Sequence, residues 1–441
     1  MATGADPFAS APLTLKAYRA LGGLVGPALP LVLDARRRAG KEDPDRLAER
    51  RGVAGPSRPA GRLAWLHGGS VGEALSLLPL AARLKAARPA TQILLTTGTV
   101  TAARLIAARL PVGAIHQYAP IDRPAYVRRF LDHWRPDAAV FVEAELWPNM
   151  VLETRRRARF MALVNARMSP RSFENWRRRA RAARCLLSAF DVVMAQDEAN
   201  AARLTGLLRR TVSGEANLKH AAPSPPTDEA AVAAFRAQIG PRRAWLAAST
   251  HEGEEEAAAD VHAALVAGFD RLLTIIAPRH PVRADAVAAM LTARGLAVAR
   301  RSADHEITPE TDVYLVDALG ELELFYRLAP VAFVGGSFVD VGGHNPLEPA
   351  RLGSAILVGP HAHNFEDDYA ALLDAGAAPR VADADELAHA VERLLKDEAA
   401  RTRQAAAAAD FARVRGATAL DVVYGRLRPG LEAALSEGDA A

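Results

Sequence analysis

The segment LAWLHGGSVGEALSLLPLAARL, residues 63–84, contains the pattern that decides the fold class. Its first four residues form a short apolar run. Paired glycines then lead into a stretch whose leucines recur with helical spacing, at Leu75, Leu78 and Leu84. A buried strand that turns directly into an amphipathic helix is typical of an α/β unit. The alternation continues with apolar runs at 92–97, 137–142, 160–164 and 191–195 and with helix-like stretches at 74–87 and 124–134.

The alternation is interrupted after His220 by AAPSPPTDE, in which three prolines suit an exposed connection. It resumes with apolar runs at 244–249, 272–278, 313–318, 331–336 and 355–360. We therefore expect an α/β protein with two doubly wound, Rossmann-like domains that face each other across a ligand-binding cleft. The expected boundaries are 1–60 for an N-terminal segment with the first helices, 61–220 for the first domain, 221–228 for the linker, and 229–441 for the second domain with the C-terminal helices.

The amino-acid composition argues against some kinds of partner and site. The formal net charge of +4 is small for 441 residues, which argues against nucleic acid as a partner. The single cysteine, Cys185, excludes an intramolecular disulfide and a site where several cysteines hold a metal. Arginine clusters such as residues 155–157 have two interpretations, either solvated helix faces or a surface for an anionic substrate or lipid.

An apolar run near the N-terminus, ALGGLVGPALPLVL at 20–33, is shorter than the roughly 20 residues that a membrane-spanning helix needs. Pro27 and Pro30 should break or kink it. Two interpretations remain open: an ordinary helix of the first domain, or a segment that lies on an anionic membrane with the basic residues 36–41 against the headgroups.

Glu73 is the first candidate for chemistry. It stands at the start of a helix after a glycine-rich turn, where the backbone can approach a ligand closely and a carboxylate can take a proton from an attacking hydroxyl. The alternative is purely structural, because Ser70 and Glu73 have the spacing of a capping box.

Further polar residues of the first half lie in VEAELWPNM, residues 142–150, and in NLKHAAP around Lys219. Glu143 and Glu145 follow a strand, where alternate side chains share a face, and paired acids can stabilise positive charge. We expect Trp147 to pack against the protein. Lys219, at the domain junction, is either a solvated lysine or a cation that approaches a phosphate or carboxylate. Two glutamates could hold a metal, but without His or Asp neighbours they are thin evidence for a metal site.

In the second half, three strand ends carry residues suited to binding a ligand. Arg279 in APRHP suits bidentate contact with phosphate or carboxylate. Gly320 in ALGEL precedes a helix whose free N–H groups can receive an anion. In GGHNPLEPA, Asn345 as N-cap, Pro346 and Glu348 make a capping pattern, or Glu348 binds a ribose diol.

The order and spacing of these motifs resemble the 3-deoxy-D-manno-octulosonic acid (Kdo) transferases of lipopolysaccharide synthesis, over nearly the whole chain from Leu63 to about Glu392. The resemblance is carried by HGGSVGE, EAELWPN, NARMS, NLK, ASTHEGEEE, APRHP, LGELELFY, FVGGSFVDVGGHNPLEPA and VGPHAHNF. The chain departs from the family at Gly68–Gly69, which replace a bulkier pair, and at extra residues around Lys219.

This resemblance implies a metal-independent, inverting GT-B glycosyltransferase without a cofactor. It would move Kdo from CMP-Kdo to the lipid A precursor (lipid IVA) at the cytoplasmic face of the inner membrane. The first domain would bind the acceptor, and the N-terminal segment would associate with the membrane. Glu73 would be the general base, and Glu143 and Lys219 would stabilise the transition state. The second domain would bind CMP through Pro278, Arg279, Leu319, Gly320, Glu321, Asn345, Pro346, Leu347 and Glu348.

Two other functions fit parts of this pattern. One is a different GT-B enzyme, such as a UDP-sugar transferase or a sugar-nucleotide epimerase, which would prefer UDP to CMP. The other is a catalytically silent nucleotide-binding, membrane-docking protein. The glutamates at 73 and 143 argue against the silent protein, because binding alone requires neither of them.

Overall fold

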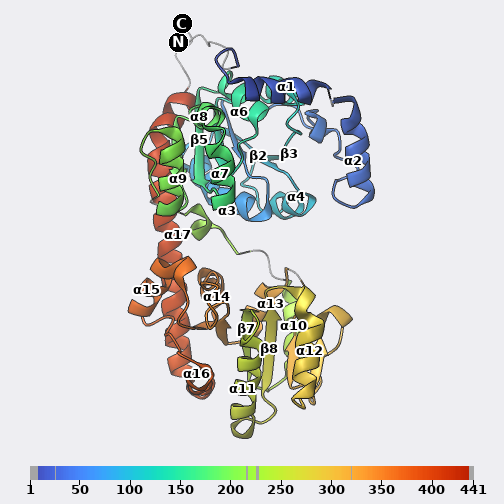
Figure 1. Cartoon of the computed structure of the whole chain (residues 1–441), viewed down its shortest axis with the longest axis vertical. Coiled ribbons are helices and arrows are strands. Elements are labelled where there is room, and N and C mark those ends of the chain that lie inside the picture. The colour runs from blue at the N-terminus through green and yellow to red at the C-terminus, as the bar shows by residue number, and fades with distance from the viewer. Residues whose placement is uncertain (1–7, 25, 215–216, 225–227, 319, 437–441) are drawn as a thin grey trace. The chain divides into compact units, whose positions relative to one another are not determined.

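The chain forms two compact units in a computed structural model that describes residues 8–24, 26–214, 217–224, 228–318 and 320–436. The first unit comprises Met1–Pro223 and Arg415–Ala441, and the second comprises Ser224–Val414 (Figure 1). Residues 225–227 of the expected linker lie outside the described residues.

The first unit is built on a six-stranded parallel sheet with the order β3-β2-β1-β4-β5-β6. All five expected strands are present, and the edge strand β3 was missed because its sequence IHQY has no apolar run. Strand β1 is buried along its whole length, as expected for a parallel strand covered on both faces. The strands are β1 (Leu63–His67), β2 (Gln92–Thr97), β3 (Ile115–Tyr118), β4 (Ala138–Val142), β5 (Phe160–Ala166) and β6 (Val192–Ala195).

Helices cover both faces of this sheet. Alternation along β1 sends Trp65 to one face, where α1, α5, α6, α8 and α9 pack, and Leu66 to the other, where α3, α4 and the end of α17 pack. The helices of this unit are α1 (Leu13–Leu24), α2 (Leu29–Arg38), α3 (Val71–Ala87), α4 (Val100–Ala107), α5 (Pro124–Trp134), α6 (Pro148–Arg155), α7 (Pro170–Arg177), α8 (Ala180–Leu187) and α9 (Glu198–Leu208).

The second unit repeats the design with a parallel sheet in the order β12-β11-β7-β8-β10-β9. Its strands are β7 (Ala244–Thr250), β8 (Leu273–Pro278), β9 (Val298–Arg300), β10 (Val313–Leu315), β11 (Val331–Val334) and β12 (Ala355–Val358). The three-residue edge strand β9 was not expected. The helices are α10 (Glu229–Ile239), α11 (Glu254–Leu265), α12 (Ala284–Ala293), α13 (Leu322–Leu328), α14 (Leu347–Leu352), α15 (Glu366–Asp374) and α16 (Ala384–Lys396).

The last helix, α17 (Glu398–Leu435), belongs to both units, which differs from the expected second domain of 229–441. Early in the helix, Ala408 packs in the core of the second unit. Later, Val423, Leu427 and Leu431 recur every four residues and pack against the first sheet. This apolar stripe explains why the end of the chain is part of the first unit.

The apolar run at 20–33 is broken, as its prolines predict. Helix α1 ends at Leu24, a short 3-10 turn covers Gly26–Ala28, and α2 begins at Leu29 with Pro30 in its first turn. Within the described residues, no helix combines the length and the apolar character needed to cross a membrane.

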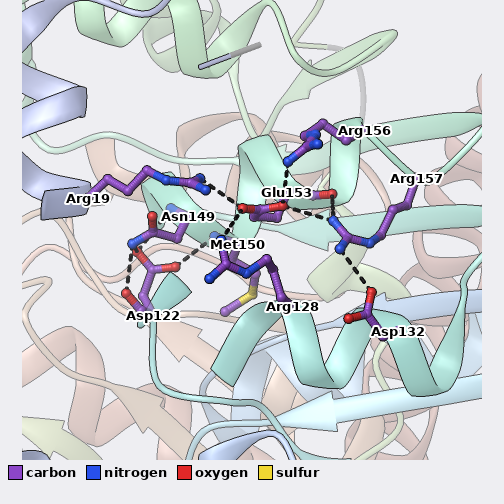
Figure 2. Close-up of polar contacts among 9 residues, drawn as sticks. All are labelled: Arg19, Asp122, Arg128, Asp132, Asn149, Met150, Glu153, Arg156 and Arg157. Carbon is purple, nitrogen blue, oxygen red and sulfur yellow. Dashed lines mark hydrogen bonds and ion pairs between the residues drawn. The ribbon is translucent and has the colours of Figure 1, made fainter. Parts of the chain in front are cut away.

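Helix α1 is held on α6 by a buried carboxylate, Glu153, whose side chain is fully enclosed. Figure 2 shows four guanidinium groups around it. Arg19 of α1 and Arg157 each approach Glu153 at 2.8 Å, Arg156 at 3.3 Å and Arg128 at 3.9 Å. One buried negative charge thus joins three separate segments of the chain.

Asp122 makes a second connection in the same region (Figure 2). Its carboxylate accepts hydrogen bonds from the backbone N–H groups of Asn149 (3.1 Å) and Met150 (2.7 Å), which lie in the first turn of α6. The hydroxyl of Tyr18 on α1 also hydrogen-bonds to Asp122. Burial raises the pKa of Asp122 to about 6, although these hydrogen bonds oppose the shift.

We predict that Glu153→Gln lowers the free energy of unfolding by about 3 kcal/mol, because it leaves several guanidinium groups without their shared counter-charge. This is the low end of the usual range, since the arginines are partly exposed. Chemical denaturation would measure the change. Glu174→Gln is the control, because the Glu174–Arg177 pair is exposed and should contribute little. A Glu153→Gln variant as stable as the wild type would contradict the prediction.

Candidate active site

Glu73 lies in the first turn of α3, and its carboxylate turns back toward the preceding loop. The hydroxyl of Ser70 donates to Oε1 (2.7 Å) and the N–H of Gly69 donates to Oε2 (2.8 Å). Ser70 is the N-cap, as predicted, and accepts from the N–H of Glu73. The reciprocal bond of a capping box goes to Gly69 instead of to the N-cap itself.

The pKa of Glu73 is raised above its ordinary value, chiefly by burial. The hydrogen bond from Ser70 opposes this shift, and the nearby charges of Glu145 and Glu143 add to it. Glu73 is nevertheless only partly buried, and Gly72 beside it is open to solvent. A partly buried carboxylate with a raised pKa is a stronger base than an ordinary glutamate and is suited to accept a proton.

Glu143 and Lys219 lie next to Glu73 and form an ion pair. Lys219 is carried by the 3-10 turn η3 (Leu218–Ala221), which is held by Asn165, whose side-chain oxygen accepts from the N–H of Leu218 (2.9 Å). A Cβ placed on Gly72 would lie 3.9 Å from Cε of Lys219, so the lysine reaches the first turn of α3. The structure therefore brings Glu73, Glu143 and Lys219 together.

Glu145 does not share a face with Glu143 by strand alternation. Strand β4 ends at Val142, and Glu143 has a left-handed backbone (φ 60°), which ends the alternation. Glu145 instead contacts Nε2 of His67 (3.2 Å) and accepts from the indole of Trp147 (2.5 Å). Burial opposes ionisation, but these hydrogen bonds prevail and hold the pKa of Glu145 below its usual value.

Trp147 is not packed as expected. Its side chain is 49% exposed, because its indole N–H is bound to Glu145 at the point where α6 begins. The ring therefore stands at the surface beside the carboxylates, where it can contact a ligand.

In the second unit, one carboxylate organises the loop after β11. Glu254, at the start of α11, accepts hydrogen bonds from the N–H groups of Gly336 (2.7 Å), Ser337 (2.9 Å) and Phe338 (2.9 Å). It also accepts from the N–H of His251 (2.9 Å). The Gly336, Ser337 and Phe338 partners lie more than 80 residues away in the sequence, so local patterns do not predict this role of Glu254.

Arg279 and His280 follow Pro278, the last residue of β8, and both are exposed. Within the described residues, the guanidinium of Arg279 has no hydrogen bond or ion pair. Its charge acts on Glu348 and on His344, so these residues lie close to it. Burial raises the pKa of Glu348, and the charges of the nearby arginines oppose the shift. The structure thus places at the carboxyl edge of the sheet a guanidinium that has no hydrogen bond or ion pair with any described residue.

Three histidines stand at the same edge. The rings of His251 and His344 are stacked, and their Nε2 atoms are 2.9 Å apart. His280 contacts His251 edge to face. Burial, together with the positive field of His251, Arg279 and His280, lowers the pKa of His344 to about 4. The motif APRHP places His280 at a strand end, but its contact with His251 and the stacking of His251 on His344 join separate segments and do not follow from the motif.

The other residues that were expected to contact CMP lie in different local structures. Helix α14 begins at Leu347 with Pro346 as its N-cap, so the expected N-cap Asn345 lies one residue too early. The Asn345 side chain still accepts from the N–H of Leu347 (3.1 Å). Leu319 lies outside the described residues. Gly320 has a positive φ of 85°, which suits glycine.

Glu321 is engaged by another part of the second unit. It is the N-cap of α13 and forms a bidentate ion pair with Arg301 (2.6 and 3.1 Å). As for metals, in the parts of the chain that the structure covers, no three His, Cys, Asp or Glu side chains gather as ligands.

Two doubly wound parallel sheets, each with polar residues at its carboxyl edge, are the architecture of the GT-B fold. Two solved structures share this fold. One is a glycosyltransferase from Rickettsia africae (10% identity, 86% of this chain and 100% of that chain, TM-score 0.53). The other is the UDP-GlcNAc 2-epimerase from Neisseria meningitidis (12% identity, 83% and 100%, TM-score 0.52).

Sequence comparison identifies the family. Residues 45–222 match the family described as 3-Deoxy-D-manno-octulosonic-acid transferase (kdotransferase). The chain is 38% identical to the 3-deoxy-D-manno-octulosonic acid transferase of Bordetella pertussis, over 84% of this chain and 89% of the relative. It is 33% identical to that of Haemophilus influenzae, over 81% and 85%. The chain therefore belongs to the Kdo transferase family and is a glycosyltransferase, which confirms the predicted resemblance.

We predict that His344 stays neutral down to a pH of about 4. An unfolded histidine takes up its proton near pH 6.5, so stability should fall as the pH is lowered from about 6.5 toward 4. NMR titration of the imidazole signals would measure the midpoint, with His344→Asn assigning the signal. The acid-induced loss of stability should be smaller in that variant. A His344 midpoint near 6.5 would refute the prediction.

Proposed function

We propose that this protein transfers Kdo from CMP-Kdo to the lipid A precursor, lipid IVA, with Glu73 as the general base and with inversion at the anomeric carbon. The observation that carries the proposal is the cluster of Glu73 with Glu143 and Lys219, found in a member of the Kdo transferase family. Membership supports Kdo as the transferred sugar, and the cluster supplies the groups that a direct displacement requires.

The acceptor hydroxyl is a poor nucleophile until a base removes its proton. Glu73 is suited to this step because its carboxylate is oriented by Ser70 and Gly69 and still has free lone pairs on both oxygens. A single base that activates the acceptor opposite the leaving CMP produces inversion. No covalent intermediate with the enzyme is then needed.

Glu143 and Lys219 act on the charges that develop during transfer. The anomeric carbon becomes positive as the bond to CMP breaks, and the carboxylate of Glu143 stabilises that charge. Lys219 pairs with Glu143 and offers further N–H donors to the carboxylate of the sugar acid. The left-handed backbone of Glu143 costs energy, and such strain is common where a side chain must be aimed at a ligand.

The second unit receives the donor. Arg279, which has no partner among the described residues, is suited to bind the CMP phosphate and to stabilise its charge as it leaves, without a metal. Glu348 is placed close to Arg279 and is suited to bind the ribose hydroxyls. The other proposed CMP contacts are Pro278, Leu319, Gly320, Glu321, Asn345, Pro346 and Leu347.

The decisive experiment is incubation of the protein with CMP-Kdo and lipid IVA, followed by mass analysis of the lipid. Transfer should add the mass of one or more Kdo units and release CMP. Calorimetry with CMP and UDP separates the alternatives, because a clear preference for UDP would indicate another GT-B enzyme. CMP binding without transfer would indicate a silent binding protein.

We predict that Glu73→Gln lowers the rate of transfer by about 10²- to 10⁴-fold, because the acceptor hydroxyl loses its base. CMP should bind with unchanged affinity, as measured by calorimetry. Glu174→Gln is the control, since Glu174 is an exposed glutamate on helix α7 of the first unit whose partner is Arg177. Near-normal transfer by Glu73→Gln would show that another group is the base.

We also propose that the protein acts at the cytoplasmic face of the inner membrane and docks through α1 and α2. Both helices present apolar side chains to solvent, among them Leu13 (83% exposed), Leu24 (76%) and Leu31 (74%). Near the start of α1, a hollow of about 510 Å³ is lined by Ser10, Pro12, Leu152, Arg155, Arg181, Arg184, Cys185, Ser188 and Ala189. Apolar side chains beside cationic ones suit an anionic lipid surface.

We predict that the protein floats with vesicles that contain anionic lipid in a density gradient, and that Leu21→Glu combined with Leu24→Glu reduces the bound fraction several-fold. Both side chains are exposed, so the substitutions should leave folding intact. Val112→Glu is the control, because Val112 is even more exposed than the two leucines but lies outside α1 and α2. Equal binding by all variants would exclude this docking surface.

A further inference from the structure

Glu145 is fixed by a chain of hydrogen bonds that starts inside the first sheet. The buried hydroxyl of Thr96 accepts from the indole of Trp65 (2.8 Å) and contacts Nδ1 of His67 (2.8 Å). Because Thr96 already accepts from Trp65, its own proton can point to Nδ1. The proton of His67 then lies on Nε2 and faces Glu145.

A second donor reaches Glu145 from the opposite direction. The indole of Trp147 donates to the same carboxylate oxygen, Oε2, that contacts His67. Both donors stabilise the ionised form, in agreement with the lowered pKa of this buried acid. The second oxygen, Oε1, remains directed toward the glycine turn before α3.

This free oxygen brings the charge of Glu145 close to Glu73. A Cβ placed on Gly69 would lie 2.6 Å from Oε1 of Glu145 and 3.7 Å from Oε2 of Glu73. The two carboxylates therefore flank the backbone of a single residue that has no side chain. A side chain at position 69 would collide with Glu145 in this arrangement, so the glycine allows the close approach.

The charged and titratable groups around Glu73 come from three elements. Glu143 and Glu145 lie in the loop after β4, Lys219 lies on η3, and His67 ends β1. Glu143 is neutralised by its ion pair with Lys219. Glu145, by contrast, is held by hydrogen bonds from His67 and Trp147 and not by a lysine or an arginine. Its negative charge is therefore not cancelled by an ion pair and acts on Glu73 at short range.

We propose that Glu145 is a positioning residue for the proposed base: it presents a permanent negative charge across Gly69 that makes Glu73 a stronger base. This inference rests on the proposed role of Glu73. A neighbouring negative charge disfavours the ionised form of Glu73 and therefore raises its affinity for the acceptor proton. His67 and Trp147 act through Glu145, because they keep it ionised and fix its direction.

The test is the pH dependence of kcat/KM for Kdo transfer in the wild type and in Glu145→Gln, which keeps the size of the side chain and removes the charge. Activity on the acidic side requires Glu73 to be deprotonated. Glu145→Gln should therefore shift the acidic limb to lower pH by roughly 0.5 to 1 unit and lower the plateau, since a weaker base remains. A residue that only supports the loop would change the plateau without moving the limb.

Three further variants keep the inference testable. Glu145→Asp retains the charge and should leave the limb near its wild-type position. Trp147→Phe removes the indole N–H that donates to Glu145. Because the Trp147 side chain is exposed, this variant should fold. Its acidic limb should shift in the same direction as in Glu145→Gln, by a smaller amount. Glu174→Gln, on the surface of α7, should change neither limb nor plateau. If Glu145→Gln does not fold, the pH profile of Trp147→Phe decides whether the inference holds.

The possible outcomes separate this inference from the proposed function. An active enzyme whose acidic limb is unchanged in Glu145→Gln and in Trp147→Phe would overturn the role of Glu145 and leave Kdo transfer intact. A wild-type protein that transfers no Kdo would instead overturn the proposed function itself. A shift to higher pH would also overturn the inference, because it is opposite to the effect of removing a negative charge.

Discussion

Each sheet is covered by helices on both faces, so the polar groups of this protein are available to ligands mainly where strands end. The carboxyl ends of parallel strands lie along one edge, which gathers loops that are distant in sequence. In the first unit this edge collects Glu73 after β1 and Glu143 after β4. In the second unit it collects Arg279 after β8 and the loop that Glu254 holds after β11. The candidate residues of each unit depend on this constraint.

At the carboxyl edges of the two sheets, glutamates differ in pKa and in contacts because their hydrogen-bond and ion-pair partners differ. Glu73 has a raised pKa from burial and from its acidic neighbours, whereas hydrogen bonds lower the pKa of Glu145. Glu143 is paired with a lysine, and Glu254 accepts four backbone N–H groups and serves the architecture of its loop. The glutamates proposed as the base, as its electrostatic neighbour and as the stabiliser of positive charge thus differ in their surroundings from one another and from the structural acid Glu254.

Local features of the sequence predicted much of the fold. The main strands, the helix at 124–134, the N-cap at Ser70 and the break in the N-terminal apolar run all follow from periodicity, capping residues and prolines. Strands β3 and β9 were missed because each is a short edge strand without an apolar run. The N-cap at Asn345 was placed one residue early, an ordinary uncertainty at helix ends.

The sequence by itself determined the two doubly wound sheets and, through its motifs, the Kdo transferase family. Both can be recognised from short local patterns and from the order of these patterns along the chain. Tertiary structure alone decided that Lys219 pairs with Glu143, that Glu145 is held by His67 and Trp147, and that α17 returns to the first unit. The physical reason is that the Lys219–Glu143 and His67–Glu145 contacts and the packing of α17 join segments that are far apart in the sequence. The left-handed backbone at Glu143 and the hydrogen-bonded indole of Trp147 then fix the directions of these two side chains, which the hydrophobic periodicity of the sequence does not predict.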